Sequence, residues 1–363
     1  MGKGVVLYLG GFILPDKNAA AQRVVGIAKG LRELGFEVVF ANGVDGLSPD
    51  ARCEKQYFGF KTLEYGREPA PDYLVTAKTA LRTIDFIAPD HVIVYNYPAA
   101  SLNRIIKHCR KKGIRCIADV TEWSTAASGS VIYRTVKKLD TLYRMKTVHK
   151  KTDGVIAVSR YLFDYYRDRV RTVVIPPTVD IKDKKWETSG DKKKAATELV
   201  YAGSPSAVKE RLDLIVDAVE KAADSADVRL DVLGITEEQF AKIYRRSGPA
   251  PASVRFLGRV DHKEAIEAVK KADWSVIIRD NNRVVRAGFP TKLVESISCG
   301  TPVIANRFSD VDLYLDESNG ALAEDTDSLP EVIRQCTQKT VSPNRELFDY
   351  RNYLEALKTV FEV

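Results

Sequence analysis

The sequence predicts two consecutive α/β domains, each built on a parallel, doubly wound sheet of the Rossmann-like type with helices on both faces. Three observations lead to this fold class. The chain has 363 residues, about twice the size of one ordinary domain. Short apolar runs alternate with segments of helical periodicity, which is the pattern of parallel sheets. The alternation stops in a polar, lysine-rich stretch and then restarts. Because open α/β sheets bind ligands at the carboxyl ends of their strands, we expect the site in a cleft between the domains.

The first domain is expected over residues 1–180 and begins with a strand at residues 5–9, which Gly10 and Gly11 end. The helix after this strand has apolar residues at helical spacing from Val24 to Leu34, and Gly35 is placed to end it. Further strands are expected over residues 36–41, 92–95, 114–120, 154–159 and 173–175. Further helices are expected over residues 74–87, 101–112 (with Ser101 as the N-cap) and 131–150.

A charged stretch over residues 181–197 has the composition of a linker. The second domain is expected over residues 198–342. Its strands are expected over residues 199–202, 230–233, 254–257, 274–278, 302–305 and 321–323. Its helices are expected from residue 212 onward and over residues 264–272 and 291–299. The remaining residues, 343–363, contain a last helical stretch at about 345–361 with no strand after it, and we expect this helix to cross back to the first domain.

Composition narrows the range of partners. The formal charge of +7, from 56 basic and 49 acidic residues, favours anionic ligands such as nucleotide phosphates or lipid headgroups. Nucleic acid is disfavoured, since no recognised nucleic-acid-binding module accompanies the charge. No stretch has the roughly 20 apolar residues of a membrane-spanning helix. The five cysteines form no CxxC pair and the four histidines show no ligand spacing, so we expect no metal, no disulfide framework and a cytoplasmic location.

The most informative segment runs over residues 279–304, where a polar loop leads into a helix. Gly288 permits close approach of the backbone, and Pro290 suits the first helical position. Lys292 falls in the first turn, where its charge opposes the helix dipole unless an anion binds at the N-terminus. Glu295, one turn later, is placed to accept hydrogen bonds from a ribose diol. The alternative is a solvated Lys292 that forms an ion pair with Glu295.

A second strand-to-helix turn contains Gly203, Ser204, Lys209 and Arg211. Its two basic residues open the next helix, so a phosphate clamp competes here with an ordinary solvated helix end. Two such loops in one domain favour an anion site more than either loop alone. Lys209 and Lys292 are then placed to hold a diphosphate together.

The helix of the first loop is flanked by Ala287-Gly-Phe-Pro-Thr-Lys-Leu-Val-Glu295 and by Cys299-Gly-Thr-Pro-Val-Ile304. These stretches resemble the donor-site signature of GT-B retaining glycosyltransferases of the family 4 type, the glycosyl transferases of group 1. Tyr201-Ala-Gly-Ser204 with Lys209 resembles the matching phosphate loop, and the match covers most of residues 199–316. The resemblance implies a GT-B fold with an interdomain cleft. It also implies transfer of a sugar, with retention, from a nucleotide sugar of the UDP or GDP type to a saccharide or lipid-linked saccharide acceptor.

The resemblance also implies which residues act. Lys209 and the backbone at Pro290–Lys292 would hold the diphosphate, and Glu295 would contact the ribose. Lys209 and Lys292 would stabilise the leaving group, so that no metal or cofactor is needed. The donor contacts are expected at Gly10, Gly11, Ser204, Lys209, Arg211, Gly288, Phe289, Pro290, Thr291, Lys292 and Glu295.

One position departs from the family pattern. The pattern has two glutamates eight residues apart, and the first of them falls on Ala287 in this chain. That glutamate usually faces the donor sugar. Asp280, Arg279 and Arg286 are the candidates to replace it.

The acceptor is expected to meet the first domain. Asp119-Val-Thr-Glu122-Trp123 lies at the end of a predicted strand. Asp119 and Glu122 are candidates to orient or deprotonate an acceptor hydroxyl. The alternative for Asp119 is a cap of the next turn. Trp123 is placed either to stack on a sugar or to pack in the core.

Two further segments each have two interpretations. Asp310-Val-Asp312 spells the DxD metal motif of another glycosyltransferase fold, but Ser309 or Asp310 more naturally caps a short helix at this place. The helix over residues 131–150 is strongly basic and has an apolar side. It is either an interfacial helix that contacts anionic lipid at the inner face of the membrane or a core helix with a solvated basic face.

We therefore expect a hexosyltransferase-type glycosyltransferase that acts in polysaccharide or glycoconjugate biosynthesis. Two alternatives stay open. A sugar-nucleotide epimerase of similar architecture would need acid–base carboxylates and histidines around the sugar, and these cannot be identified. A catalytically silent nucleotide-sugar-binding subunit is supported by Ala287.

Overall fold

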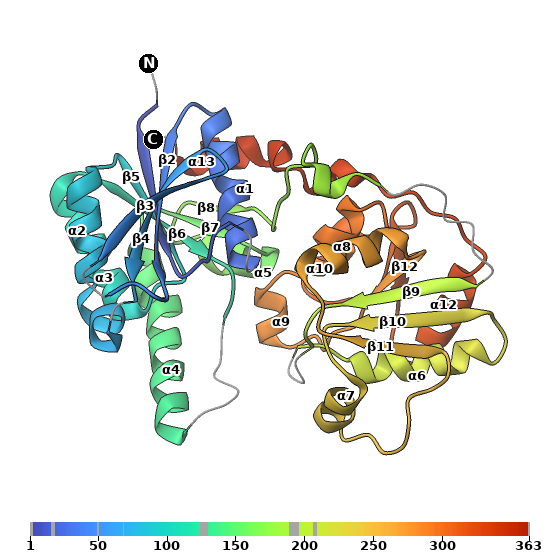
Figure 1. The fold of residues 1–363 in the computed structure, drawn as a ribbon. Helices are drawn as coiled ribbons and strands as arrows, with labels where there is room; N and C mark the ends of the chain where they lie inside the picture. Colours follow the sequence, from blue (N-terminus) through green and yellow to red (C-terminus); the bar gives the residue numbers. More distant parts are fainter. Residues whose placement is uncertain are drawn as a thin grey trace. The chain divides into compact units, whose positions relative to one another are not determined.

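The computed structural model of the chain describes residues 3–15, 19–48, 51–67, 69–123, 130–188, 196–205 and 209–361. The chain divides into two compact units (Figure 1). The first comprises Met1–Val179 and Tyr350–Val363, and the second comprises Asp180–Asp349. Each unit contains a largely or wholly parallel sheet with helices, which confirms the predicted fold class of two Rossmann-like domains.

The sheet of the first unit has eight strands within the described residues, in the order β3-β4-β2-β1-β5-β6-β7-β8. Neighbouring strands are parallel except for β3 and β4, which are antiparallel. The central strands are continuous apolar runs because they are buried on both faces. The strands are β1 Val5–Gly10, β2 Glu37–Val44, β3 Arg52–Tyr57, β4 Phe60–Gly66, β5 His91–Tyr95, β6 Arg115–Val120, β7 Gly154–Ala157 and β8 Thr172–Val174.

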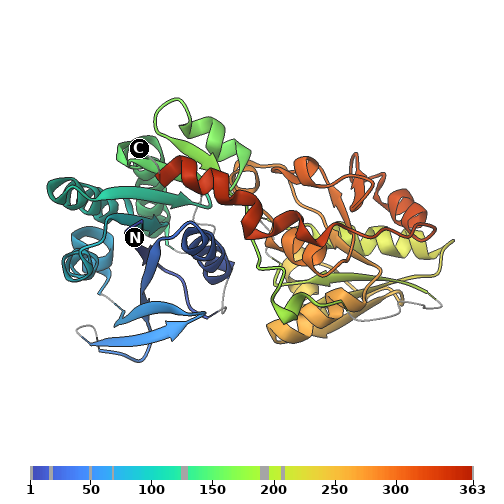
Figure 2. The ribbon, with the colours of Figure 1, turned by 90° about the horizontal axis from the view of Figure 1, so that it is seen from above.

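Helices cover both faces of this sheet (Figure 2). The last helix, α13, packs on α1, β7 and β8. Gly30 of α1 makes room for it, since a Cβ there would lie 2.6 Å from Leu357 Cδ1. The helical elements of this unit are α1 Ala19–Glu33, η1 Asp72–Thr76, α2 Lys78–Ile87, α3 Ala99–Lys112, α4 Val131–Tyr143, η2 Arg144–Val148, η3 His149–Lys151, α5 Arg160–Tyr166, η6 Tyr350–Tyr353 and α13 Leu354–Phe361.

The sheet of the second unit has six parallel strands within the described residues, in the order β11-β10-β9-β12-β13-β14. They are β9 Thr197–Ala202, β10 Val228–Leu233, β11 Val254–Gly258, β12 Trp274–Ile277, β13 Val303–Asn306 and β14 Gly320–Ala323. The helical elements are η4 Lys184–Trp186, α6 Leu212–Ala223, α7 Glu237–Tyr244, α8 His262–Lys271, α9 Arg283–Ala287, α10 Thr291–Ser298, α11 Val311–Tyr314, α12 Leu329–Cys336 and η5 Arg345–Phe348. Each unit has its own apolar core.

The hairpin of β3 and β4 is absent from the prediction. The side chains of β3 are mostly exposed and polar, so the strand carries no apolar signal. The turn between the strands has positive φ at Phe58 (52°) and Gly59 (79°). Such turns are usually marked by asparagine or aspartate before the glycine, and a phenylalanine hides the signal. One edge of the sheet is therefore antiparallel.

Four predicted helices differ from the structure. The helix expected over 131–150 is an α-helix only as far as Tyr143 and continues as the π-helical η2 and the 3-10 turn η3. The helix expected over 74–87 is interrupted at Ala77, whose φ is 55°. The helix expected from Ser101 begins earlier, at Ala99, and the Ser101 hydroxyl donates to the carbonyl of Tyr73 instead of capping. The stretch 345–361 consists of two short 3-10 turns followed by α13.

Candidate active site

Lys292, in the first turn of α10, is the centre of a buried polar cluster in the second unit. Its Nζ donates to both carboxylate oxygens of Glu210, at 2.6 and 2.7 Å, and to the Tyr201 hydroxyl at 3.1 Å. The Tyr201 hydroxyl in turn donates to Glu210. Arg279 donates to Glu210 from a separate direction, at 2.7 Å. Lys292 is thus anchored on Tyr201, near the end of β9, and on Glu210, just before α6.

Gly203, directly after β9, explains how this turn and α10 come together. Its φ is 142°, a backbone conformation that residues with a side chain rarely adopt. A Cβ at Gly203 would lie 2.5 Å from Cε and 2.9 Å from Nζ of Lys292. A glycine is therefore required for the Lys292 side chain to cross the turn. The predicted phosphate loop and the start of α10 do lie side by side.

The charges of the cluster depend on one another. Burial raises the pKa of Glu210, but the charges of Lys292 and Arg279 and their hydrogen bonds outweigh it, so that this pKa lies below its ordinary value. Burial lowers the pKa of Lys292, and the Glu210 carboxylate opposes that effect only in part. The side chains of Lys292 and Glu210 are only 14% and 7% exposed. Loss of Glu210 would leave the buried Lys292 without its counter-charge, whereas Glu210 would keep its ion pair with Arg279 after loss of Lys292.

The loop before α10 is fixed by packing and by a hydrogen bond. The Phe289 ring is buried and meets the rings of Tyr314 and Phe348 edge-on, with centroids 5.4 and 5.9 Å apart. The Ser309 hydroxyl donates to the Gly288 carbonyl at 2.6 Å. The helix begins at Thr291, so Pro290 is its N-cap residue, one position before the predicted one. The N-terminus of α10 is therefore held in a defined place beside Lys292.

Of the other residues predicted to contact the donor, two form ion pairs within the protein and two are exposed. Glu295 is paired with His262, at 3.1 Å, so that Lys292 pairs with Glu210 and not with Glu295. Arg211 forms ion pairs with Asp213 at 2.8 Å and with Asp280 at 3.2 Å. Ser204 and Lys209 are exposed. Residues 206–208, between these two, lie outside the described residues.

Ala287 is fully buried at the end of α9. The three residues suggested to replace a glutamate at this position have the following surroundings. Arg279 is tied to Glu210 and Asp280 to Arg211, while Arg286 is exposed. The carboxylate that lies nearest to Lys292 is Glu210, which the sequence prediction did not select.

In the first unit, Asp119 is the acceptor of a buried ion pair. Its carboxylate accepts hydrogen bonds from Arg23 at 2.6 and 2.9 Å and from the Tyr8 hydroxyl at 2.5 Å. Burial, and then the Asp119 charge, raise the pKa of Tyr8 well above its ordinary value. Asp119 is 1% exposed. The carboxylate is therefore occupied within the protein and closed to an external hydroxyl.

The residues that follow Asp119 after the end of β6 differ from it in burial and in contacts. Glu122 is half-buried. Trp123 is buried against Tyr165 and Tyr161, with ring centroids 4.9 and 6.3 Å apart, so that it packs in the core. Gly10 and Gly11, at the end of β1, line a cavity of the first unit. Their contact with the donor stays a prediction.

The DxD sequence lies at the start of a short helix, α11, as the helix-cap interpretation expects, although Asp310 makes no side-chain capping bond. Asp312 pairs with Arg307 at 3.8 Å. Within the described residues, no group of histidine, cysteine and acidic side chains could hold a metal ion. Across the same part of the chain, no helix has the length and apolar character needed to span a membrane.

Comparisons with known proteins agree with this architecture. The model of the glycosyl transferases group 1 family matches residues 196–339, and the model of glycosyltransferase family 4 matches residues 20–183. Among solved structures, HepE of Anabaena in complex with UDP-glucose is similar, with a TM-score of 0.66, 16% identity and coverage of 98% of this chain and 100% of that chain. A search of curated protein sequences finds no match.

Two other similar structures are enzymes with different products. Sucrose-phosphate synthase from Thermosynechococcus elongatus has a TM-score of 0.65 at 15% identity and covers 98% of this chain and 95% of its own. The lipopolysaccharide outer core galactosyltransferase WaaB has a TM-score of 0.66 at 15% identity, with coverage of 98% and 99%. The chain is a glycosyltransferase of the GT-B type.

In this glycosyltransferase Tyr201, Glu210 and Arg279 surround Lys292. The sequence predicts other roles for Tyr201 and Arg279 and none for Glu210. The positions of Tyr201 and Arg279, at the end of β9 and just after β12, were a usable signal, because neighbouring parallel strands bring their carboxyl ends together. The pairing of Glu210 with a lysine 82 residues later left no signal in the sequence.

Proposed function

We propose that this glycosyltransferase belongs to the family 4 type and transfers a hexose, with retention, from a UDP- or GDP-sugar to a saccharide or lipid-linked saccharide. The second unit would bind the donor and the first would bind the acceptor. The observation that carries the proposal is the buried ammonium of Lys292, held between the turn after β9 and the N-terminus of α10. A helix N-terminus and a fixed cation together favour a diphosphate.

The proposed chemistry places charge stabilisation at the leaving group. As the bond between the sugar and the phosphate breaks, negative charge develops on the nucleoside diphosphate. Lys292 and the backbone N–H groups at the start of α10 would stabilise that charge without a metal. A bound phosphate would compete with Glu210 for Lys292, while Arg279 and Tyr201 continue to hold the Glu210 carboxylate. Glu122 is the proposed contact to the acceptor hydroxyl, since Asp119 is occupied by Arg23 and Tyr8.

A thermal-shift panel with UDP, GDP, ADP and CMP tests the donor site directly. A ligand at about 100 times its dissociation constant stabilises the protein by about 2.7 kcal/mol. We expect UDP or GDP to raise the melting temperature and the other nucleotides to leave it nearly unchanged. If none of the four nucleotides raises the melting temperature, the proposal is contradicted.

Product analysis then separates the alternatives. Incubation of the responsive UDP- or GDP-sugar without any acceptor should leave the sugar's configuration at C2 and C4 unchanged. Conversion to an epimer in this mixture would identify an epimerase instead. Nucleotide binding with no transfer to any member of a broad acceptor panel would identify a silent binding subunit.

A specific observation also favours contact with a membrane surface. In α4 only Thr141 is buried, so the core-helix interpretation does not hold for residues 131–143, although Met145 and Val148, later in the same predicted helix, are buried. Large apolar side chains of α4 are exposed to between 46% and 78%, and Arg134 and Lys138 are exposed beside them. The exposed apolar residues are Val131, Ile132, Tyr133, Val136, Leu139 and Tyr143.

Not every basic residue after α4 belongs to this exposed surface. Arg144 is buried and donates to the carbonyls of Asn96 and Tyr97, each at 3.1 Å. An exposed helix that is apolar on one side and basic on the other fits an anionic lipid surface. We place α4 on the inner face of a cytoplasmic membrane, where the reducing environment is consistent with the buried free thiols of Cys109, Cys116 and Cys299.

Sedimentation with vesicles tests this contact. The protein should bind vesicles that contain phosphatidylglycerol more tightly than vesicles of phosphatidylcholine alone. Leu139→Ser should weaken the binding about tenfold or more, because the leucine no longer enters the lipid. Leu313→Ser is the matched control, since Leu313 is 59% exposed in the second unit and Leu139 is 61% exposed. Equal binding by both variants would contradict the proposed surface.

A further inference from the structure

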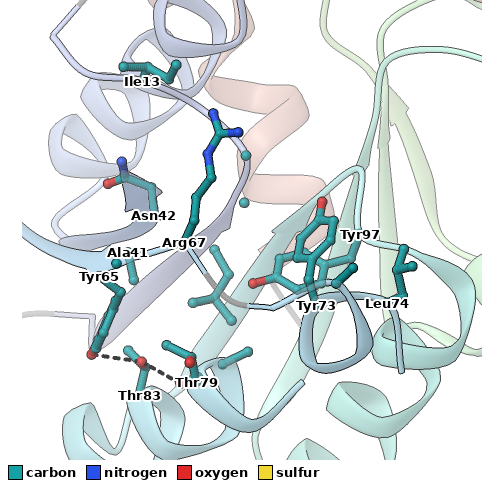
Figure 3. Close-up of a pocket in the computed structure, with 17 residues that line it drawn as sticks. Ile13, Ala41, Asn42, Tyr65, Arg67, Tyr73, Leu74, Thr79, Thr83 and Tyr97 are labelled. Carbon is teal, nitrogen blue, oxygen red and sulfur yellow. Dashed lines mark hydrogen bonds between the residues drawn. The ribbon is translucent and has the colours of Figure 1, made fainter. Parts of the chain in front are cut away.

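The first unit contains a cavity of about 440 Å³ at the carboxyl ends of β1, β2 and β4 (Figure 3). On one side it is lined by glycines at or next to the ends of these strands, Gly10, Gly11, Gly43 and Gly66. Residues of η1 and α2 form another side. The volume is in the range of small-molecule sites, and strand ends are where α/β sheets bind ligands. The cavity lies wholly in the first unit and shares no residue with the Lys292 cluster.

The walls of the cavity are apolar and aromatic. Tyr73 and Tyr97 lie next to each other at one end, with ring centroids 5.7 Å apart (Figure 3). Ile13 and Leu74 line the cavity and are partly exposed to solvent, at 36% and 46%. Val75, the neighbour of Leu74 in η1, is 44% exposed. An apolar surface therefore continues from the cavity to the outside of the protein.

Some polar side chains of the lining are engaged within the protein. The Thr83 hydroxyl contacts the Tyr65 hydroxyl at 2.8 Å and the Thr79 carbonyl at 2.7 Å (Figure 3). Arg67 forms an ion pair with Asp45 at 2.8 Å and is 69% exposed, which places it at the mouth. The amide atoms of Asn42 are buried and closed off from solvent, and neither has a hydrogen-bond partner within the described part of the chain. Among the described lining residues, none has a carboxylate.

These walls suit a hydrocarbon better than a sugar ring. A buried hydroxyl without a hydrogen-bond partner costs about 1–3 kcal/mol, and a sugar has several. We propose that the cavity binds the uncharged hydrocarbon portion of an amphiphilic acceptor, that is, the alkyl or prenyl chain of a glycolipid next to its sugar. The ligand's role as the acceptor rests on the proposed function, whereas the binding itself does not.

Calorimetric titration of the protein with methyl, butyl and hexyl β-glucosides, each below its micelle concentration, tests the inference. If the chain enters the cavity, affinity rises about fourfold with each methylene that is buried. Affinity that does not depend on chain length would overturn the inference and would assign the cavity to the sugar ring. No nucleotide is present, so a missing donor response leaves this result intact.

Variants locate the bound chain. Gly11→Val fills the cavity, because a Cβ at Gly11 meets no atom within 4 Å. Ala70→Leu fills it from another wall and serves if Gly11→Val does not fold. Both should abolish the dependence on chain length, whereas the exposed-helix control Ala100→Leu should retain it. Leu139→Ser should also retain it. Suppose instead that Leu139→Ser abolishes the dependence on chain length and both cavity variants retain it. That result would place the alkyl chain on α4 and overturn the inference.

Discussion

Replacement of Lys292 by methionine is expected to lower the rate of sugar transfer by about 10²–10³-fold, the usual effect of removing one preorganised donor from developing charge. Methionine keeps most of the length of the side chain and removes the ammonium. The nucleotide-induced thermal shift should fall as well, because Lys292 is the buried cation of the proposed phosphate site. Steady-state kinetics with the donor that responds in the panel provides the measurement.

The matched control is Lys270→Met. Lys270 is also a lysine of the second unit with a mostly buried side chain, 6% exposed, and it pairs with Glu267 at 2.7 Å within α8. Its loss should affect stability but not the nucleotide shift. A normal transfer rate in Lys292→Met, or an equal loss in Lys270→Met, would remove Lys292 from the site. Circular dichroism of both variants shows whether each is folded.

The largest expected effect on stability is that of Asp119→Ala. The substitution leaves Arg23, which is 3% exposed, without its counter-charge and leaves the Tyr8 hydroxyl without its acceptor. Breaking a buried pair of this kind costs about 3–5 kcal/mol. Urea unfolding, with hydrogen exchange measured on peptides of β1 and β6, reports the change in the first unit.

Two controls separate the structural role of Asp119 from a catalytic one. Asp164→Ala removes one of the two exposed ion-pair partners of Arg167, and it should change stability far less. Glu122→Gln should reduce transfer while leaving the unfolding transition in place. If Asp119→Ala unfolded at the same urea concentration as the wild type and only lost activity, Asp119 would be a catalytic residue after all.

The sequence allowed prediction of the elements whose signal is local. Strand β1 is a continuous apolar run, α1 has helical spacing, and α10 begins within one residue of the predicted position. Lys292 was recognised because a lysine in a first turn conflicts with the helix dipole. Each of these inferences needed only a short window of residues.

Features that depend on distant residues could not be predicted in this way. Arg23 and Asp119 are 96 residues apart, and only the folded sheet brings them together. The acid–base interpretation of Asp119 was reasonable from its place after a strand, but the partner that occupies it lies on α1. Helix α4 was ambiguous for the related reason that amphipathic spacing does not say whether anything covers the apolar side.

The position of residues 350–361 has a consequence for the order in which the two units can be completed during synthesis. The first unit is completed by residues from Tyr350 onward, and Tyr350 N–H donates to the Val179 carbonyl at 2.9 Å. The buried side chains of Leu357, Val360 and Phe361 belong to the core of that unit. The second unit is thus an insertion between two parts of the first. During synthesis all residues of the second unit are therefore translated before the last residues of the first unit. The core of the first unit stays incomplete until residues 350–361 have left the ribosome, and deletion of these residues would damage the unit that was begun earliest.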